Sequence, residues 1–173
     1  TLDAENFVAT VRAGMSYAAL QSELRRQGLW LPLQPFYASE ATVGGMAATN
    51  DSGFPNPHLN ALRDLVLGMT VITADGRPVH FGGVTVKNVA GYDMCKLFLG
   101  SYGTLGIITD ITLKLAPAPE EEAALLIVTD DLQGAMERCG KFFGVCDVDS
   151  ALELMDWECA RQVFQAAGLE EMA

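Results

Sequence analysis

Two glycine-rich stretches contain the residues whose types and spacing suit cofactor chemistry. In the first, ATVGGMAATNDSG (residues 41–53), Gly44 and Gly45 stand among hydroxyl and amide side chains that can donate hydrogen bonds to phosphate or ring oxygens. In the second, GSYGTLG (residues 100–106), three glycines precede an alternating apolar and polar run. Glycine lets a ligand approach the main chain without meeting a Cβ atom. Together the two loops predict a large bound cofactor, although each one alone is also typical of an ordinary tight turn.

Neither loop carries a common nucleotide-binding signature. The phosphate-binding pattern G-x-x-x-x-G-K-[ST] is absent, since the only Gly-Lys pair, Gly140-Lys141, is followed by Phe142. No G-x-G-x-x-G opens a helix after a strand either. The sequence therefore argues against a P-loop nucleotidase and against an NAD-binding Rossmann unit.

Three segments resemble a known family when they are taken in order. They are LWLPLQPFYASEATVGGMAATNDSG, RDLVLGMTVITADGRPVHFGG and TVKNVAGYDMCKLFLGSYGTLGIITDITLKLAP. Together they resemble the second half of the FAD-binding domain of the vanillyl-alcohol oxidase and p-cresol methylhydroxylase (PCMH) type. The resemblance covers about residues 8–119, and KNVAGYD is particularly similar to the FAD-binding E subunit of bacterial glycolate oxidase.

The resemblance implies that FAD is the cofactor and that nine residues contact it: Pro35, Thr42, Gly44, Gly45, Asn50, Ser52, Gly53, Gly103 and Ile108. Tyr102 stands where many relatives carry Glu, which changes the charge beside the proposed site. Relatives also begin with a GGGT-like loop that holds the pyrophosphate, and no such loop precedes the second half here. We therefore expect a fragment that lacks the N-terminal half of the domain and holds FAD weakly or not at all.

The resemblance also implies an activity. It predicts an FAD-linked oxidoreductase that oxidises a small 2-hydroxy acid such as glycolate or D-lactate, with hydride transfer to FAD, and an isolated fragment that is inactive. Other oxidase subunits, including an iron–sulfur subunit, would be its partners. Two alternatives stay open at this point: a noncatalytic flavin-binding or assembly subunit of an oxidase complex, and a structural domain that has lost FAD.

Individual reactive side chains give no catalytic residue. His58 and His80 lie in no matching motif, and Asp93 is typical of a helix start. Lys87 would either stabilise negative charge near the flavin or face solvent. The four cysteines form no C-x-x-C pair, so neither a metal site nor a disulfide framework is predicted.

Composition limits the partners. With 11 basic and 22 acidic residues among 173, the formal charge is −11, which opposes binding to nucleic acid and to anionic membranes. No apolar run approaches the roughly 20 residues of a membrane-spanning helix, and no signal segment opens the chain. We expect a cytoplasmic protein without direct membrane insertion, associated with a membrane only through partner subunits.

The pattern of hydrophobic residues predicts an α+β fold in two parts. The resemblance implies that residues 1–118 form the second subdomain of a PCMH-type domain, a mixed sheet flanked by helices. They are expected to contain strands at 7–12, 64–73 and 77–81, a helix capped by Ser16, a helix at 92–99, and a strand with Ile107, Ile111, Leu113 and Leu115 on one face. The run APAPEEE indicates a boundary. Residues 119–173 would begin a β-α-β cap domain, with strands at 123–129 and 150–156 and helices at 132–143 and 158–167.

Overall fold

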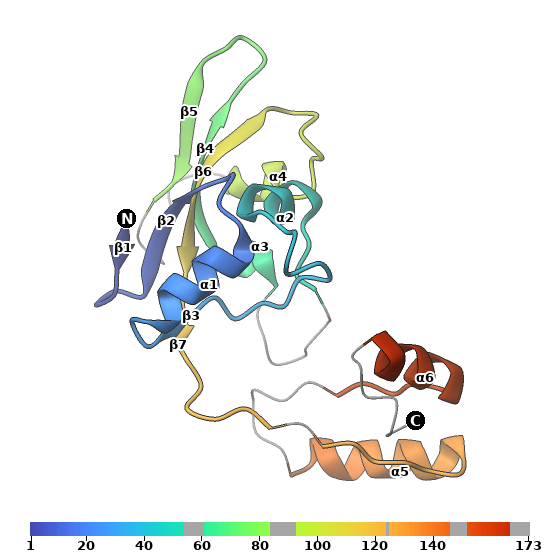
Figure 1. The fold of residues 1–173 in the computed structure, drawn as a ribbon. Helices are drawn as coiled ribbons and strands as arrows, with labels where there is room; N and C mark the ends of the chain where they lie inside the picture. Colours follow the sequence, from blue (N-terminus) through green and yellow to red (C-terminus); the bar gives the residue numbers. More distant parts are fainter. Residues whose placement is uncertain (54–60, 84–92, 124, 146–151, 167–173) are drawn as a thin grey trace. The chain divides into compact units, whose positions relative to one another are not determined.

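The computed structural model describes residues 1–53, 61–83, 93–123, 125–145 and 152–166, and divides the chain into two compact units, Thr1–Ala123 and Ala124–Ala173 (Figure 1). The expected α+β class is confirmed. The first unit contains a five-stranded sheet with helices packed on it, and the second unit contains two helices. The two units are described separately below.

The sheet of the first unit has the strand order β1-β2-β6-β4-β5. Its strands are β1 (Leu2–Asp3), β2 (Val8–Arg12), β4 (Val66–Ile72), β5 (Pro78–Gly82) and β6 (Ile107–Lys114). Every pairing among the described strands is antiparallel rather than mixed. The predicted hairpin joins β4 to β5 and extends beyond the helices (Figure 1). A second, two-stranded sheet pairs β3 (Leu29–Trp30) with β7 (Ala116–Pro117).

The described residues of this unit form four helices: α1 (Tyr17–Arg25), α2 (Val43–Thr49), α3 (Leu62–Leu65) and α4 (Cys95–Phe98). Helix α1 forms as predicted, because the Ser16 hydroxyl accepts a hydrogen bond from the Ala19 N–H at 3.2 Å and the apolar side chains at helical spacing are buried. Helix α2 packs against β2 and β6, and α4 packs against β4. Asp64 and Leu65, which were expected to begin the strand at 64–73, end the short helix α3 instead, and the strand β4 begins at Val66.

An irregularity in β6 corrects the predicted inward face of that strand. Thr70 pairs with Asp110 while the next residue of β4, Val71, pairs with Ile108, so Thr109 is an extra residue on β6. A bulge of this kind reverses the alternation of side chains beyond it. As a result Ile107 is 67% exposed, whereas Ile108 packs against the core beside Ile111.

The second unit contains α5 (Leu132–Phe143) and α6 (Trp157–Ala166), as the sequence predicted to within one residue at each described end. The two strands expected around them do not form within residues 125–129 and 152–156. Leu125 and Val128 are 73% and 81% exposed. A strand needs a neighbour for its N–H and C=O groups, and these residues pair with no strand in the described part of the chain.

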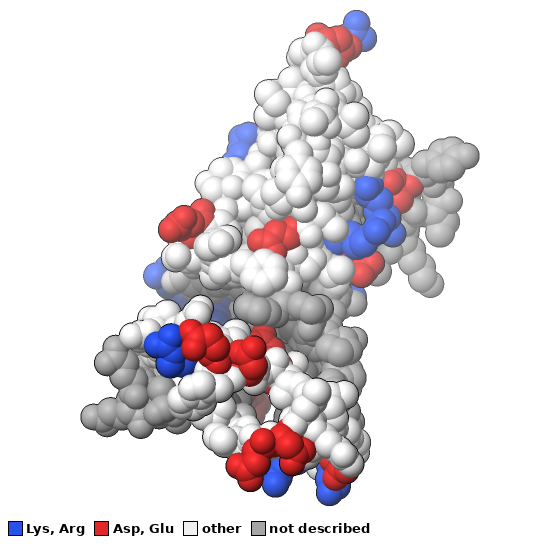
Figure 2. Space-filling view, turned by 90° about the vertical axis from the view of Figure 1, so that its right-hand side faces the viewer, with Lys and Arg blue, Asp and Glu red and all other residues white. Residues whose placement is uncertain are grey.

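Six of the ten Lys and Arg side chains in the described residues form ion pairs. Arg12, Arg25, Arg26, Arg77, Lys96 and Arg161 each lie within 3.3 Å of a carboxylate oxygen. Figure 2 shows the basic groups of one face beside acidic groups, without a continuous basic patch. Such a surface disfavours binding to a polyanion.

Candidate functional site

The first glycine-rich stretch forms the start of α2. The Thr42 hydroxyl caps this helix by accepting a hydrogen bond from the Gly45 N–H at 3.1 Å. The next N–H groups are also engaged, since Val43 donates to the Met15 carbonyl at 2.9 Å and Gly44 donates to the Ala13 carbonyl at 2.7 Å. The backbone donors at this helix start are therefore used within the fold, and the Thr42 hydroxyl keeps its own proton to donate.

The second glycine-rich stretch is attached to the other end of α2. The Gly100 N–H donates to the Ala47 carbonyl at 3.0 Å, and the Tyr102 N–H donates to the Ala48 carbonyl at 2.8 Å. Tyr102 adopts φ 51° with its side chain 72% exposed, and Gly103 adopts φ 73°. These bonds place the loop beside α2, the helix that the first stretch forms, although about 50 residues separate the two stretches in sequence.

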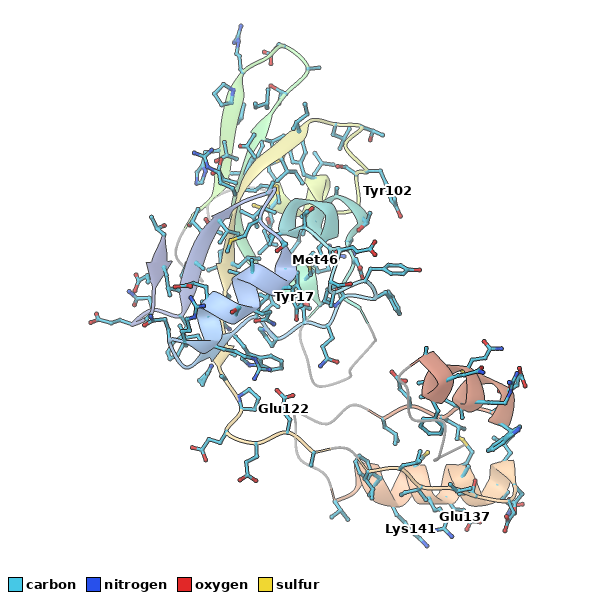
Figure 3. The ribbon with its side chains drawn as sticks, in the orientation of Figure 1. Tyr17, Met46, Tyr102, Glu122, Glu137 and Lys141 are labelled. Carbon is cyan, nitrogen blue, oxygen red and sulfur yellow. The ribbon has the colours of Figure 1, made fainter. Side chains whose placement is uncertain are left out.

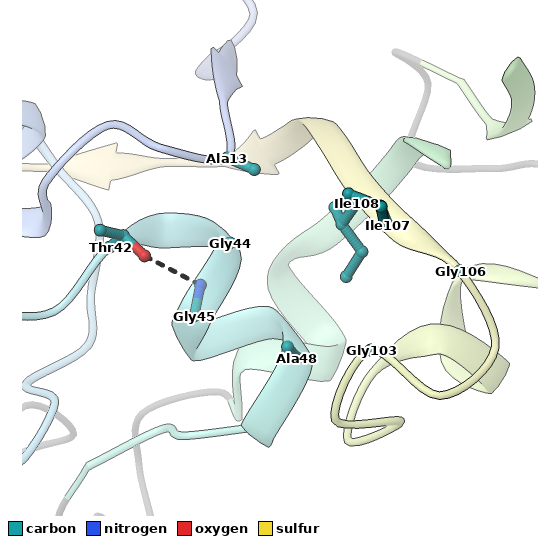
Figure 4. Close-up of a pocket in the computed structure, with 9 residues that line it drawn as sticks. All are labelled: Ala13, Thr42, Gly44, Gly45, Ala48, Gly103, Gly106, Ile107 and Ile108. Carbon is teal, nitrogen blue, oxygen red and sulfur yellow. Dashed lines mark hydrogen bonds between the residues drawn. The ribbon is translucent and has the colours of Figure 1, made fainter. Parts of the chain in front are cut away.

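A hollow of about 320 Å³ lies between the two stretches (Figure 4). Helix α2 forms one wall, the loop and the first residues of β6 form the other, and Ala13 lies between them. Nine residues line it: Ala13, Thr42, Gly44, Gly45, Ala48, Gly103, Gly106, Ile107 and Ile108. Four of the nine are glycines and none is charged, so the walls are smooth and offer mainly backbone and aliphatic surface.

The four glycines of the hollow differ in what a Cβ atom would meet. At Gly44 it would lie 2.5 Å from the Ala13 Cβ, and at Gly106 it would lie 2.6 Å from a Val71 methyl carbon. Both glycines are therefore required by packing within the protein. At Gly45 the only close atom is the Thr42 Oγ1 at 3.0 Å, and at Gly103 no atom lies within 4 Å. These two glycines leave open space beside the backbone.

Pro35 and Gly53 lie on two segments that contact each other outside the hollow. Gln34 and Gly53 form an isolated parallel bridge, and a Cβ atom on Gly53 would lie 1.5 Å from the Gln34 carbonyl oxygen. Pro35 is buried beside this contact. Gly53 is thus needed for the close approach of the two backbones, independently of any ligand.

Asn50 and Ser52 have local structural partners. Asn50 ends α2 in the left-handed conformation, with φ 54° and its N–H directed to the Ala47 carbonyl. The Ser52 hydroxyl accepts a hydrogen bond from the Leu62 N–H at 2.9 Å, at the start of α3. The Asn50 backbone and the Ser52 hydroxyl shape the chain that leaves α2, and a role toward a cofactor stays a prediction for both residues.

Five of the nine predicted site residues thus line the hollow, namely Thr42, Gly44, Gly45, Gly103 and Ile108. The sequence analysis missed Ala13, Ala48 and Ile107 as lining residues and did not include Gly106 in the site. Ala48 carried a usable signal, because it lies one helical turn after Gly44 and Gly45. Ala13 had no such signal, since only the fold brings the end of β2 to α2.

Other reactive groups lie elsewhere. Asp93 forms an ion pair with Lys96 at 3.3 Å at the start of α4, and His80 Nδ1 lies 3.2 Å from the Thr70 hydroxyl on the sheet. Burial raises the pKa of the Cys95 thiol to about 11, so this cysteine is protonated at neutral pH. His58 and Lys87 lie outside the described residues.

The described ranges offer neither a metal site nor a membrane-spanning helix. No group of three or more His, Cys, Asp or Glu side chains is placed there to hold a metal ion. Within those ranges, no helix combines the length and the apolar character that crossing a membrane requires.

The first unit thus combines an antiparallel sheet with a glycine-lined hollow beside its helices, and part of this unit matches a known family. Residues 1–82 match the model of a family described as FAD binding domain, and this part of the chain belongs to that family, with FAD as its cofactor. Gly103 and Ile108 lie beyond the matched residues. The hollow fits an uncharged part of such a cofactor, because open space flanks Gly45 and Gly103 and none of the nine described lining residues is charged.

Several curated proteins are similar over most of the chain. Glycolate oxidase subunit GlcE from Escherichia coli is 38% identical over 158 residues, which are 87% of this chain and 45% of the relative. Glycolate oxidase subunit GlcD from Bacillus subtilis is 34% identical, and a D-lactate dehydrogenase from Anaerostipes hadrus is 38% identical. Each of these two alignments covers 90% of this chain and 33% of the relative. The chain therefore spans less than half the length of these relatives.

Solved structures are similar as well. Two crystal structures of alkyldihydroxyacetonephosphate synthase match with TM-scores of 0.60 and 0.59 at 28% and 27% identity. Each match covers 70% of this chain, and it covers 21% and 22% of the respective synthase chains.

Proposed function

We propose that this chain forms part of the FAD site of an oxidoreductase that oxidises a small 2-hydroxy acid, with glycolate and D-lactate as the first candidates. The names of the relatives support this substrate class, since they include glycolate oxidase subunits and a D-lactate dehydrogenase. The family matched by residues 1–82 supports the cofactor.

The observation that carries the proposal is the hollow between the two glycine-rich stretches. Two segments far apart in sequence meet there, and five of the residues assigned to FAD from the resemblance share its lining. Gly45 and Gly103 keep space open beside the backbone without a packing partner that requires it. A bare backbone on both sides of a cavity is what a large planar ligand needs in order to lie against main chain.

The hollow by itself supplies binding rather than proton transfer. When bound, FAD supplies the two-electron acceptor for oxidation of a substrate C–H bond. Among the nine described residues that line the hollow, Thr42 alone has a polar side chain, and its hydroxyl caps α2. None of these nine titrates near neutral pH, so they would orient the cofactor and exclude water. A base for the substrate hydroxyl must then come from residues other than these nine.

A reduction experiment on the full-length protein tests the proposal. The purified protein, loaded with FAD, is titrated anaerobically with glycolate and with D-lactate while its visible flavin absorbance is followed. Bleaching by either acid, with no effect of acetate or propionate as matched acids without the hydroxyl, is the expected result. Failure of the full-length protein to bind FAD would refute the proposal at its first step.

A noncatalytic flavin-binding or assembly subunit is the second candidate. The absence of any titratable residue among the nine that line the hollow favours it, as does the similarity to proteins that are named as subunits. The discriminating result is a flavin that stays oxidised with every 2-hydroxy acid in the isolated protein and is reduced once neighbouring subunits are added.

The proposed setting is an oxidase complex in the cytoplasm, with an iron–sulfur subunit among the partners and membrane association only through them. The proposed domain boundary lies at residues 118 and 119, with a cap domain beginning after it. Co-purification of the tagged full-length protein tests the partners, and identification of the co-purified subunits decides whether one carries iron and sulfur.

A further inference from the structure

The segment that joins β3 to α2 carries two of the predicted site residues, Pro35 and Thr42. It contains exposed side chains at its tip, with Phe36 57% and Tyr37 74% exposed. A loop of this exposure must be fixed at its ends if it is to present the same surface to a ligand each time. Both fixing points are provided by α1.

Tyr17, on the first turn of α1, joins the two ends of this loop (Figure 3). Its backbone N–H donates to the Ala41 carbonyl at 2.8 Å, and its phenol hydroxyl donates to the Leu33 carbonyl. The side chain is 7% exposed. Burial is the largest cause that raises the pKa of Tyr17, so the phenol keeps its proton for this bond.

Gln21, one turn later on α1, holds the strand side of the same loop. Its Oε1 accepts from the Leu31 N–H at 3.0 Å, and its Nε2 donates to the Leu31 carbonyl at 2.7 Å. The amide therefore pairs with both backbone groups of Leu31, as a neighbouring strand would. Its Nε2 also donates to the Tyr17 hydroxyl at 2.7 Å, which links the two side chains.

We propose that Tyr17 and Gln21 are positioning residues of the FAD site, which hold the loop of residues 33–41 in the conformation that binds the cofactor. The proposal rests on the proposed function. Ala41 precedes Thr42, which caps α2, and Gln34 forms the bridge to Gly53. Loss of these side-chain bonds would therefore release the Pro35 end of the loop, while the Thr42 end stays held by the bonds of the Val43 and Gly44 N–H groups to Met15 and Ala13.

The network stands apart from the hollow, so its effect on binding must be indirect. Neither Tyr17 nor Gln21 lines the hollow, and their partners on the loop are backbone carbonyl and N–H groups. Backbone partners fix the path of a segment whatever side chains it carries. Loss of the network should thus change the loop more than it changes the core beneath it.

The test compares Tyr17→Phe and Gln21→Met with two control variants in the full-length protein. Both test variants keep the bulk of the side chain and remove its side-chain hydrogen bonds, while the backbone bond from the Tyr17 N–H to the Ala41 carbonyl remains. Gln27→Met makes the same chemical change as Gln21→Met at an exposed position after α1. Ile111→Val removes one methylene group from a residue of β6 in the same hydrophobic core. The measurements are the FAD dissociation constant of the apo-protein and the rate of chymotrypsin cleavage after Phe36 and Tyr37.

We expect each test variant to raise the FAD dissociation constant about tenfold, which corresponds to about 1.4 kcal/mol. Cleavage at the loop should accelerate in the same variants and stay at the wild-type rate in both controls. Gln21→Met provides the test on its own if Tyr17→Phe does not fold.

Wild-type affinity in the folded test variants would overturn the positioning role and leave the proposed function intact. An equal loss of affinity in Ile111→Val would also overturn it, because the effect would then follow general stability. Absence of FAD binding by the wild-type protein would refute the proposed function, and the inference with it, before any substitution is made.

Discussion

Adjacent glycines at the start of α2 should respond in opposite ways to the same added methyl group. Gly44→Ala would place its Cβ 2.5 Å from the Ala13 Cβ and 2.9 Å from the Ala13 carbonyl oxygen. The carbonyl belongs to the backbone and already accepts the Gly44 N–H at 2.7 Å, so it cannot move away cheaply. Overpacking of this kind costs about 1–3 kcal/mol of unfolding free energy.

Gly45→Ala meets only the Thr42 Oγ1, at 3.0 Å. Alanine in a helix interior is favoured over glycine by about 1 kcal/mol, and a small shift of the cap would offset part of that gain. The expected change in unfolding free energy is therefore between about 0 and 1 kcal/mol, in the stabilising direction. The new methyl group would, however, stand in the open space beside the backbone at the hollow.

The two variants are compared by urea denaturation of the full-length apo-protein and by FAD titration. Gly44→Ala should lose stability. Gly45→Ala should keep its stability and weaken FAD binding by about tenfold or more, equivalent to at least about 1.4 kcal/mol. Gly14→Ala is the control, since no atom lies within 4 Å of its Cβ position. Wild-type FAD affinity in Gly45→Ala would refute the cofactor assignment of this wall, and wild-type stability in Gly44→Ala would refute the packing argument.

Three other outcomes are expected. Gly103→Val should abolish retention of FAD by the full-length protein. It should also lower the free energy of unfolding by about 1–2 kcal/mol, since the φ of 73° at this position is unfavourable for a residue with a Cβ atom. Tyr102→Gly, at φ 51°, should raise the free energy of unfolding in the same denaturation assay. Cys95 has a folded-state pKa raised from about 9 to about 11, so the folded protein holds the thiol proton more tightly than the unfolded protein. The free energy of unfolding should therefore fall as the pH rises from about 9 to about 11. Cys95→Ala should reduce the slope of the unfolding free energy against pH in that range. The 173-residue chain alone should purify without stoichiometric flavin, because its hollow contains no charged side chain and the first N–H groups of α2 are already bonded; a stoichiometric flavin absorbance would contradict this.

The sequence by itself determined the elements that depend on neighbouring residues. The cap at Ser16, the hairpin between β4 and β5, and the bounds of α5 follow from capping, turn chemistry and helical spacing. These interactions act over a few residues, so their signals are present in any short window of the chain. The resemblance to a family also predicted a cofactor site at the two glycine-rich stretches.

Only the tertiary structure decided which of those glycines leave space and which are filled by protein. Gly44 faces Ala13 of another element, whereas Gly45 faces the hollow, and their sequence context is the same. The tertiary structure also decided that the Ser52 hydroxyl bonds to the Leu62 N–H, and that the extra residue Thr109 moves Ile107 to the exposed side. Contacts between distant segments depend on strand register and on how a helix rotates against a sheet. A single residue's shift changes which side chain faces inward, and no local pattern records that shift.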